Sequence, residues 1–181
     1  MPARDSPEPD RPGFEPQRIL DALSRHSVRY VLIGGFAAVI HGSPYVTTDV
    51  DVVPDTTREN LDRLSAALRE MHARVWTSGE PGGFEFHHDG ESLARANVWN
   101  LVTDHGRLDL TLRPSGTTGF EDLARDAVHL TILGADVDVA SLADVVRSKE
   151  AAGREKDRWV LPVRRRILEE GETHPAKNAP S

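Results

Sequence analysis

Two aspartates stand at a spacing that could hold a metal ion. Asp49 and Asp51 lie in residues 48–53, where polar and apolar residues alternate as in a β-strand. Residues two apart on a strand point to the same face, about 6 to 7 Å from each other along the chain. Magnesium prefers carboxylate oxygens, and two carboxylates at this spacing can bind one ion or share a pair. We therefore expect a divalent-metal site on this strand.

A third acid, Asp109, lies between leucines in residues 108–112, which are expected to form another strand. Three acids that lie close together repel one another, which raises a pKa unless a cation supplies a counter-charge. The chain contains no cysteine, so oxygen and imidazole atoms are its available metal ligands. The three aspartates thus favour a hard cation such as Mg²⁺.

A diglycine precedes these acids in the chain. Gly34 and Gly35 end the apolar run at residues 30–33, which predicts a buried strand, and residues 36–41 predict a short helix directly after it. A turn without Cβ atoms lets the backbone approach a triphosphate closely. The alternative is tight packing between strand and helix. The chain has neither the Gly-x-Gly-x-x-Gly pattern nor a Gly-Lys-Ser/Thr loop.

The elements that must position these residues indicate an α+β domain, in which a mixed central sheet is flanked by helices and followed by C-terminal helices. We expect one domain at residues 16–170, with disordered tails at 1–15 and 171–181. Further strands are expected near residues 84–88, 97–103 and 128–133. Helices are expected from about Pro16, after Thr57, after Ser141 and over residues 156–168.

Composition narrows the function classes. The formal net charge of −7 argues against a protein that coats nucleic acid by neutralising phosphates. No apolar run is long enough to span a membrane, so we expect a cytoplasmic protein without a membrane partner. Three lysines stand among the 22 basic residues, which draws attention to Lys149 and Lys156.

Taken in order, these motifs resemble a known signature. Gly34-Gly35, a gap, Asp49-Val50-Asp51 and a distant Asp109 between leucines are similar to the pattern of nucleotidyltransferases of the DNA polymerase β-like superfamily. Residues 32–35, 41–42, 48–51 and 148–157 resemble the bacterial AbiEii and MenT toxin nucleotidyltransferases in particular. In many of those relatives a basic residue precedes the paired acids, where this chain has Tyr45-Val46.

The resemblance implies an enzyme that transfers a nucleoside monophosphate from an NTP to a hydroxyl and releases pyrophosphate. It implies that Asp49 and Asp51 bind two Mg²⁺ ions, which Mn²⁺ could replace, and that Asp109 binds one ion and activates the acceptor. Gly34, Gly35, Lys149 and Lys156 would contact the nucleotide. The acceptor would be tRNA, a protein or a small molecule such as an antibiotic. A toxin with an antitoxin partner is also implied.

Other interpretations stand beside this one. The fold could serve a catalytically silent binding or regulatory protein, although retained acids argue against that. Asp49 and Asp51 could lie on a solvated strand face, and Lys149 could be a solvated helix residue. We interpret Asp136-Val137-Asp138 as a turn, and adjacent His87 and His88 as a poor chelate because they point to opposite strand faces. Residues 164–166, three arginines, are expected to form a solvated helix face.

Overall fold

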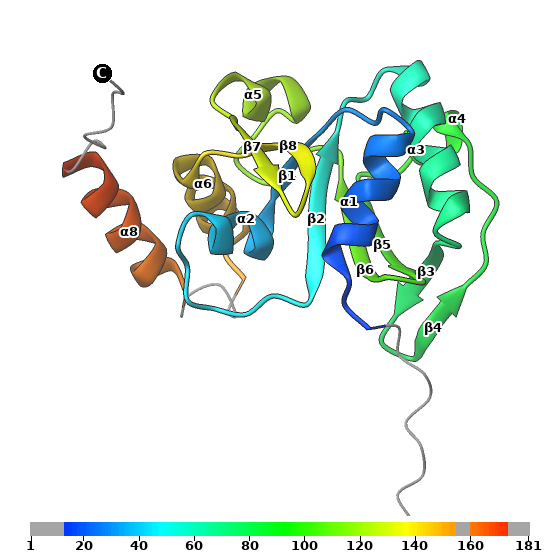
Figure 1. Ribbon diagram of the computed structural model, residues 1–181, viewed down its shortest axis with the longest axis horizontal. Coiled ribbons are helices and arrows are strands. Elements are labelled where there is room, and N and C mark those ends of the chain that lie inside the picture. The colour runs from blue at the N-terminus through cyan, green and yellow to red at the C-terminus, as the bar shows by residue number, and fades with distance from the viewer. Residues whose placement is uncertain (1–12, 155–159, 174–181) are drawn as a thin grey trace, which may run out of the picture.

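A mixed eight-stranded sheet forms the centre of the protein (Figure 1). The computed structural model describes residues 13–154 and 160–173. Across the sheet the strands run in the order β4-β3-β5-β6-β2-β1-β8-β7. Their bounds are β1 (Tyr30–Ile33), β2 (Asp49–Pro54), β3 (Arg74–Thr77), β4 (Glu80–Phe84), β5 (Val98–Thr103), β6 (Gly106–Thr111), β7 (Val128–Ile132) and β8 (Ala135–Val139). Strand β2 pairs in parallel with β6 and β1 pairs in parallel with β8, whereas the other neighbours are antiparallel.

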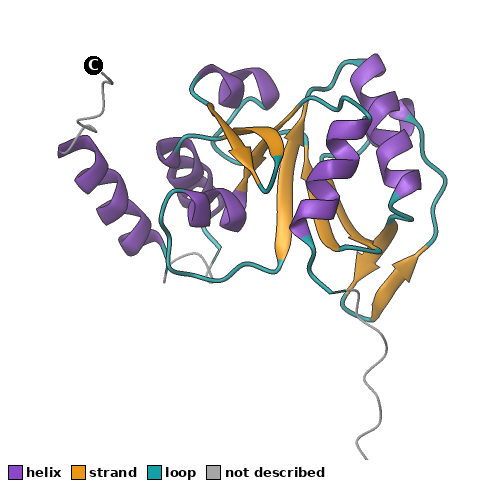
Figure 2. Ribbon diagram, in the orientation of Figure 1, coloured by secondary structure: helices purple, strands orange, loops and turns teal. Residues whose placement is uncertain are grey.

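Helices flank this sheet, as Figure 2 shows. Their bounds are α1 (Pro16–Arg25), α2 (Gly34–Ile40), α3 (Arg58–Glu70), α4 (Gly90–Leu93), α5 (Phe120–Arg125), α6 (Leu142–Ala152) and α8 (Leu161–Thr173). The expected α+β architecture, with a mixed sheet and helices at the C-terminal end, is confirmed. In the described part of the chain, no helix combines the length and apolarity needed to cross a membrane.

The two faces of the sheet differ in character at β6. Leu108 and Leu110 are fully or almost fully buried in the core, where leucines of α1 and α3 also lie. Arg107 and Asp109 alternate with them and are only half-buried. Because alternate residues of a strand face opposite sides, one face of β6 builds the core and the other carries polar groups. We call the second the site face.

Several elements differ from the sequence-based expectations. Residues 136–138 belong to strand β8 and not to a turn, because Ala135, Val137 and Val139 are buried while the aspartates between them face outward. The turn lies one step earlier, where Leu133 and Gly134 have φ angles of 52° and 87°. The turn of this hairpin is therefore tight, and the residues that the sequence pattern assigned to a turn belong to the second strand.

The region around residues 74–88 also departs from expectation. The strand expected near residues 84–88 is wrong except at Phe84, because residues 85–88 form no strand and β4 lies at Glu80–Phe84. Its partner β3 was not predicted. Among the strands of the described residues, β4 lies at the edge of the sheet with β3 as its single neighbour, so it tolerates Pro81 and two glycines that would weaken a central strand. Its glycines and proline also remove the alternating pattern by which a strand is recognised.

Phe14 and residues 171–173, which the sequence assigned to the two tails, have defined structure. Phe14, which precedes the expected start, packs edge-on against Phe36 with ring centroids 6.5 Å apart. Helix α8 continues to Thr173, while residues 156–159 of the expected last helix lie outside the described residues, as do most of the two expected tails. Arg164 is 5% exposed, so the expectation of a fully solvated arginine face is wrong at that position.

A buried asparagine joins α3 to the loops that bracket β1 and β2. Asn60 is fully buried; its Oδ1 accepts a hydrogen bond from the Arg29 backbone N–H at 2.7 Å, and its Nδ2 donates to the carbonyls of Arg29 and Asp55 at 2.9 and 2.8 Å. Each buried polar group left without a partner costs about 1 to 3 kcal/mol. Asn60→Ala should therefore lower the free energy of unfolding by about 3 kcal/mol, measured by urea denaturation. Exposed Glu59→Ala on the same helix should change it by less than about 0.5 kcal/mol.

Candidate active site

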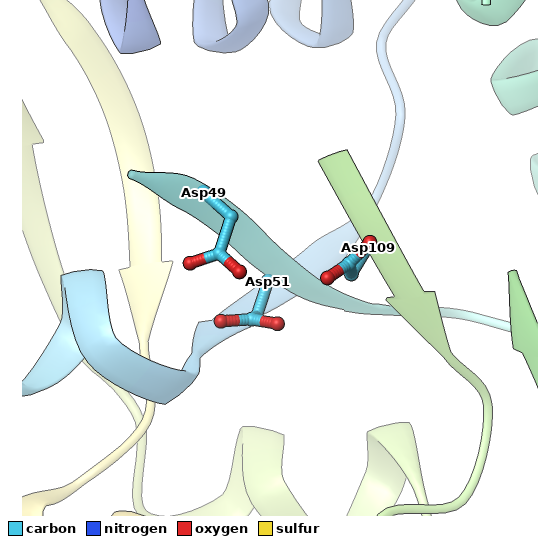
Figure 3. Close-up of side chains that lie close together, drawn as sticks. All are labelled: Asp49, Asp51 and Asp109. Carbon is cyan, nitrogen blue, oxygen red and sulfur yellow. The ribbon is translucent and has the colours of Figure 1, made fainter. Parts of the chain in front are cut away.

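The three aspartates singled out in the sequence meet on the site face of the sheet. Strand β2 carries Asp49 and Asp51, and the parallel neighbour β6 places Asp109 directly beside Asp51 in the register. One ligand oxygen from each of the three carboxylates lies within 4.8 Å of the others. Figure 3 shows the three carboxylates facing a common space from these two strands. The arrangement can hold a cation between them.

Asp51 is the most perturbed of the three acids. Its pKa rises to about 7, because burial disfavours the charged form and the charges of Asp49 and Asp109 add to the effect. The charge of Lys149 and a hydrogen bond from the Gly35 backbone N–H act in the opposite direction without cancelling it. Without a cation, therefore, the protein holds this carboxyl in an environment that opposes its ionisation.

Asp49 and Asp109 are held by different partners. The Thr47 hydroxyl donates to Oδ1 of Asp49 at 3.0 Å and also contacts the Asp49 carbonyl at 3.2 Å. Burial raises the pKa of Asp109, although the guanidinium of Arg107 beside it lowers that pKa. Nη2 of Arg107 donates to both oxygens of Asp109, at 3.0 and 3.3 Å. Arg107 was not among the residues expected to bind metal or nucleotide, although it stands two residues before Asp109 on an expected strand.

The diglycine lies against Asp51. Helix α2 begins at Gly34 itself and not after the pair, as the sequence had suggested. Gly34 has a φ of 71°, and a Cβ atom at this position would lie 2.7 Å from Cγ of Asp51 and nearer still to Oδ2. A Cβ on Gly35 would lie 3.0 Å from the Thr47 hydroxyl. The absence of side chains at 34 and 35 therefore makes room for the acidic cluster.

A cavity of about 140 Å³ opens beside these groups. Gly34, Asp51 and Lys149 belong to its lining. Lys149 is on helix α6, which begins after Ser141 as expected, and the Ser141 hydroxyl caps the helix by accepting a hydrogen bond from the Asp144 N–H. Arg113 and Arg154 add two more basic residues to the lining. The cavity thus combines an acidic site with cationic groups, which suits a polyanion that arrives with a metal ion. Lys156 lies outside the described residues.

The pKa of Asp51 gives a prediction for the metal-free protein. Between about pH 4 and pH 7 the folded state binds up to one more proton at Asp51 than the unfolded chain, whose carboxyl has a pKa near 3.8. The contribution of Asp51 to stability is therefore fully present below that range and is lost as the pH rises through about 7. In EDTA, the free energy of unfolding should fall from about pH 5 to about pH 7.5 by about 2 kcal/mol more in the wild type than in Asp51→Asn. Urea denaturation of both proteins at the two pH values checks this, and equal changes would contradict it.

Comparison with known proteins identifies the family of this chain. The family model of aminoglycoside-2''-adenylyltransferases matches residues 17–160, which include the whole sheet and the acidic cluster. The chain belongs to this family. A comparison with curated proteins gives no match. The expected nucleotidyltransferase superfamily is confirmed, whereas the matches give no support to the AbiEii and MenT subgroup.

Solved structures agree on the fold of this adenylyltransferase family member. The lincomycin-bound lincosamide adenylyltransferase LnuA is 14% identical over 86% of this chain and 99% of its own, with a TM-score of 0.56. The aminoglycoside enzyme ANT(2'')-Ia, in complex with adenylyl-2''-tobramycin, is 15% identical over 86% and 90%, with a TM-score of 0.53. A protein of Thermotoga maritima assigned as a nucleotidyltransferase is 18% identical over 85% and 90%, with a TM-score of 0.50. At these identities the likeness shows the fold.

Proposed function

We propose that the protein transfers a nucleoside monophosphate from an NTP to a hydroxyl of a small molecule and releases pyrophosphate. The observation that carries the proposal is the convergence of Asp49, Asp51 and Asp109 beside a cavity lined by basic residues. Nucleotidyl transfer needs this combination, because its catalysis consists chiefly of positioning and charge neutralisation. A purely binding or regulatory protein would gain nothing from three carboxylates that repel one another.

The acidic cluster fits Mg²⁺. Its donors are hard carboxylate oxygens, and a bound cation would offset the burial and the charges of Asp49 and Asp109 that raise the pKa of Asp51. We propose that Asp49 and Asp51 bind two Mg²⁺ ions and that Asp109 binds one of them; Mn²⁺ is the natural substitute. When bound, the ions supply charge neutralisation for the triphosphate and lower the charge repulsion among the three acids.

The protein's own groups divide the remaining work. Asp109 would accept the proton of the acceptor hydroxyl, which is the role that the resemblance implies for the third acid of the cluster. Lys149 would neutralise part of the triphosphate charge, which its position in the lining of the cavity and its electrostatic effect on Asp51 support. Gly34 and Gly35 would let the backbone approach the phosphates. Lys156 remains a further candidate for the same role.

A small antibiotic is the acceptor that the comparisons favour. The family is named for adenylyl transfer to the 2'' hydroxyl of aminoglycosides, and one structural neighbour was solved with an adenylylated aminoglycoside and another with a lincosamide. We therefore propose ATP as the donor and an aminoglycoside hydroxyl as the first acceptor class. The net charge of −7 agrees with this choice and disfavours RNA. An RNA or protein acceptor and an antitoxin partner receive no support from these matches.

The test is an acceptor panel. Each of the four NTPs is incubated with Mg²⁺ and with aminoglycosides, lincosamides, tRNA or a protein extract in separate reactions, and products are identified by intact mass. We expect a single added AMP on an aminoglycoside with wild-type protein and none with Asp49→Asn. Nucleotide addition only to RNA or protein would refute the small-molecule acceptor, and transfer by Asp49→Asn would remove the proposed site.

A further inference from the structure

Arg107 is fixed beside Asp109 by several contacts at once. Both residues are on β6 two positions apart, so their side chains share the site face of the sheet. Besides its two contacts with Asp109, the guanidinium donates through Nε to the carbonyl of Leu101 on the neighbouring strand β5 at 3.1 Å. The Arg107 and Asp109 side chains are 23% and 14% exposed. An ion pair this sheltered keeps its geometry better than a solvated surface pair.

A tryptophan covers the guanidinium. Cζ of Arg107 lies 3.7 Å from the ring centroid of Trp76, close enough for a cation–π contact. Trp76 is on β3, which β5 separates from β6 in the sheet. The register explains how they meet: Val102 of β5 pairs with both Arg107 and Arg74, and Trp76 follows Arg74 by two residues on the same face. The indole therefore reaches across β5 to Arg107.

This arrangement distinguishes Asp109 from the other two acids. Asp49 accepts a hydrogen bond from the Thr47 hydroxyl, and Asp51 accepts one from the Gly35 backbone N–H. Both of these donors are uncharged. Asp109 also receives a backbone hydrogen bond, from Leu101, but it is held in addition by a charged, planar side chain. An aromatic ring and a backbone carbonyl keep that side chain in one orientation. A guanidinium has no freedom to follow a moving carboxylate when two of its sides are occupied.

We propose that Trp76 and Arg107 form a positioning pair that fixes the Asp109 carboxylate toward the acceptor hydroxyl. Arg107 acts by holding the carboxylate, and Trp76 acts by holding Arg107, so that Trp76 influences the reaction without contacting either substrate. The proposal rests on the proposed function for the role of Asp109. Substitution of either residue should therefore slow the transfer step. Nucleotide binding should stay intact, because neither residue lines the cavity.

Steady-state kinetics of four variants test the pair. Trp76→Leu removes the ring, Trp76→Phe keeps an aromatic face, and Arg107→Lys keeps the charge but loses the planar fork. Displacing a reacting group by about 1 Å can cost about 100-fold in rate. We expect kcat to fall about 10-fold or more in Trp76→Leu and Arg107→Lys, with the KM for the NTP within about twofold of wild type. Trp76→Phe should recover most of the rate, and exposed Arg95→Lys serves as the arginine control.

A second readout is independent of activity. The Nε–H proton of Arg107 should resonate upfield in the NMR spectrum of the free protein, because Nε is bonded to the Cζ atom that lies over the Trp76 ring. It should exchange slowly, because Nε donates to the Leu101 carbonyl. Trp76→Leu should remove the upfield shift. Unchanged kcat in a folded Trp76→Leu variant, or an equal loss in Trp76→Phe and Trp76→Leu, would overturn the positioning role while the proposed function stands. A wild type without transfer would refute the proposed function, and an Arg107 signal without the ring shift would refute the pair by itself.

Discussion

Gly34→Ala should reduce nucleotidyl transfer by about 1,000-fold or more while the protein remains folded. The new methyl group would occupy space now taken by the Asp51 carboxylate, lying 2.7 Å from its Cγ, and one of the two must move. A shift of about 1 Å in a metal-binding carboxylate costs about 100-fold, and the loss of its ligand geometry costs more. The φ of 71° adds about 1 kcal/mol of backbone strain for any residue other than glycine. Initial rates on the best acceptor, with thermal unfolding in parallel, measure both effects.

Gly134→Ala is the matched control for this experiment. Gly134 has a φ of 87° in the turn between β7 and β8, and a Cβ there would meet no atom within 4 Å. The control therefore carries the backbone strain without the clash, and its transfer rate should stay within about twofold of wild type. If Gly34→Ala kept its activity, Asp51 would not be needed in its present position. If both variants lost activity equally, the effect would come from backbone strain alone.

Asp51→Asn should abolish transfer and leave the metal-free protein at least as stable as wild type. The amide keeps the size of the side chain but offers no charge to a cation, so we expect a loss of about 1,000-fold or more in kcat/KM. Burial and two neighbouring acids disfavour the charged form of Asp51, so removing the charge relieves repulsion. The melting temperature of Asp51→Asn in EDTA at about pH 7.5 should therefore be a few degrees above that of the wild type.

Thermal unfolding with and without Mg²⁺ separates the loss of metal binding in Asp51→Asn from the relief of charge repulsion. Wild-type protein should gain thermal stability with Mg²⁺, because the ion binds the folded state, whereas Asp51→Asn should gain little. Exposed Asp126→Asn, which removes a carboxylate at the C-terminal end of α5, should behave as wild type in both buffers. A large loss of stability of Asp51→Asn in EDTA would mean that Asp51 has a structural role and would contradict this account.

The sequence predicted much of this site because its information is local. Alternation in residues 48–53 indicates a strand, and a strand places Asp49 and Asp51 on one face. The leucines around Asp109 indicate that its neighbours are buried, which the structure confirms for Leu108 and Leu110. Such periodic patterns extend over a few residues and are visible without any knowledge of the tertiary structure.

The remaining features of the site depend on contacts between distant segments. The parallel pairing of β2 with β6 puts Asp51 beside Asp109, and no local pattern specifies that partner or register. The same holds for Trp76, which meets Arg107 across an intervening strand and lies in a hairpin whose glycines hide the strand pattern. The closeness of Gly34 to Asp51 is equally non-local, since a Cβ at position 34 would meet the Asp51 side chain, 17 residues later in the chain.

The position of the label in the product tests nucleotidyl transfer most directly. ATP labelled at the α-phosphate and, in a parallel reaction, at the γ-phosphate is incubated with wild-type protein, Mg²⁺ and an aminoglycoside, and Asp109→Asn serves as the blank. We expect the α label on the aminoglycoside and the γ label in pyrophosphate, with neither product in the blank. A γ label on the aminoglycoside would show phosphoryl transfer, and an α label found only in free AMP would show hydrolysis; either result would contradict the account.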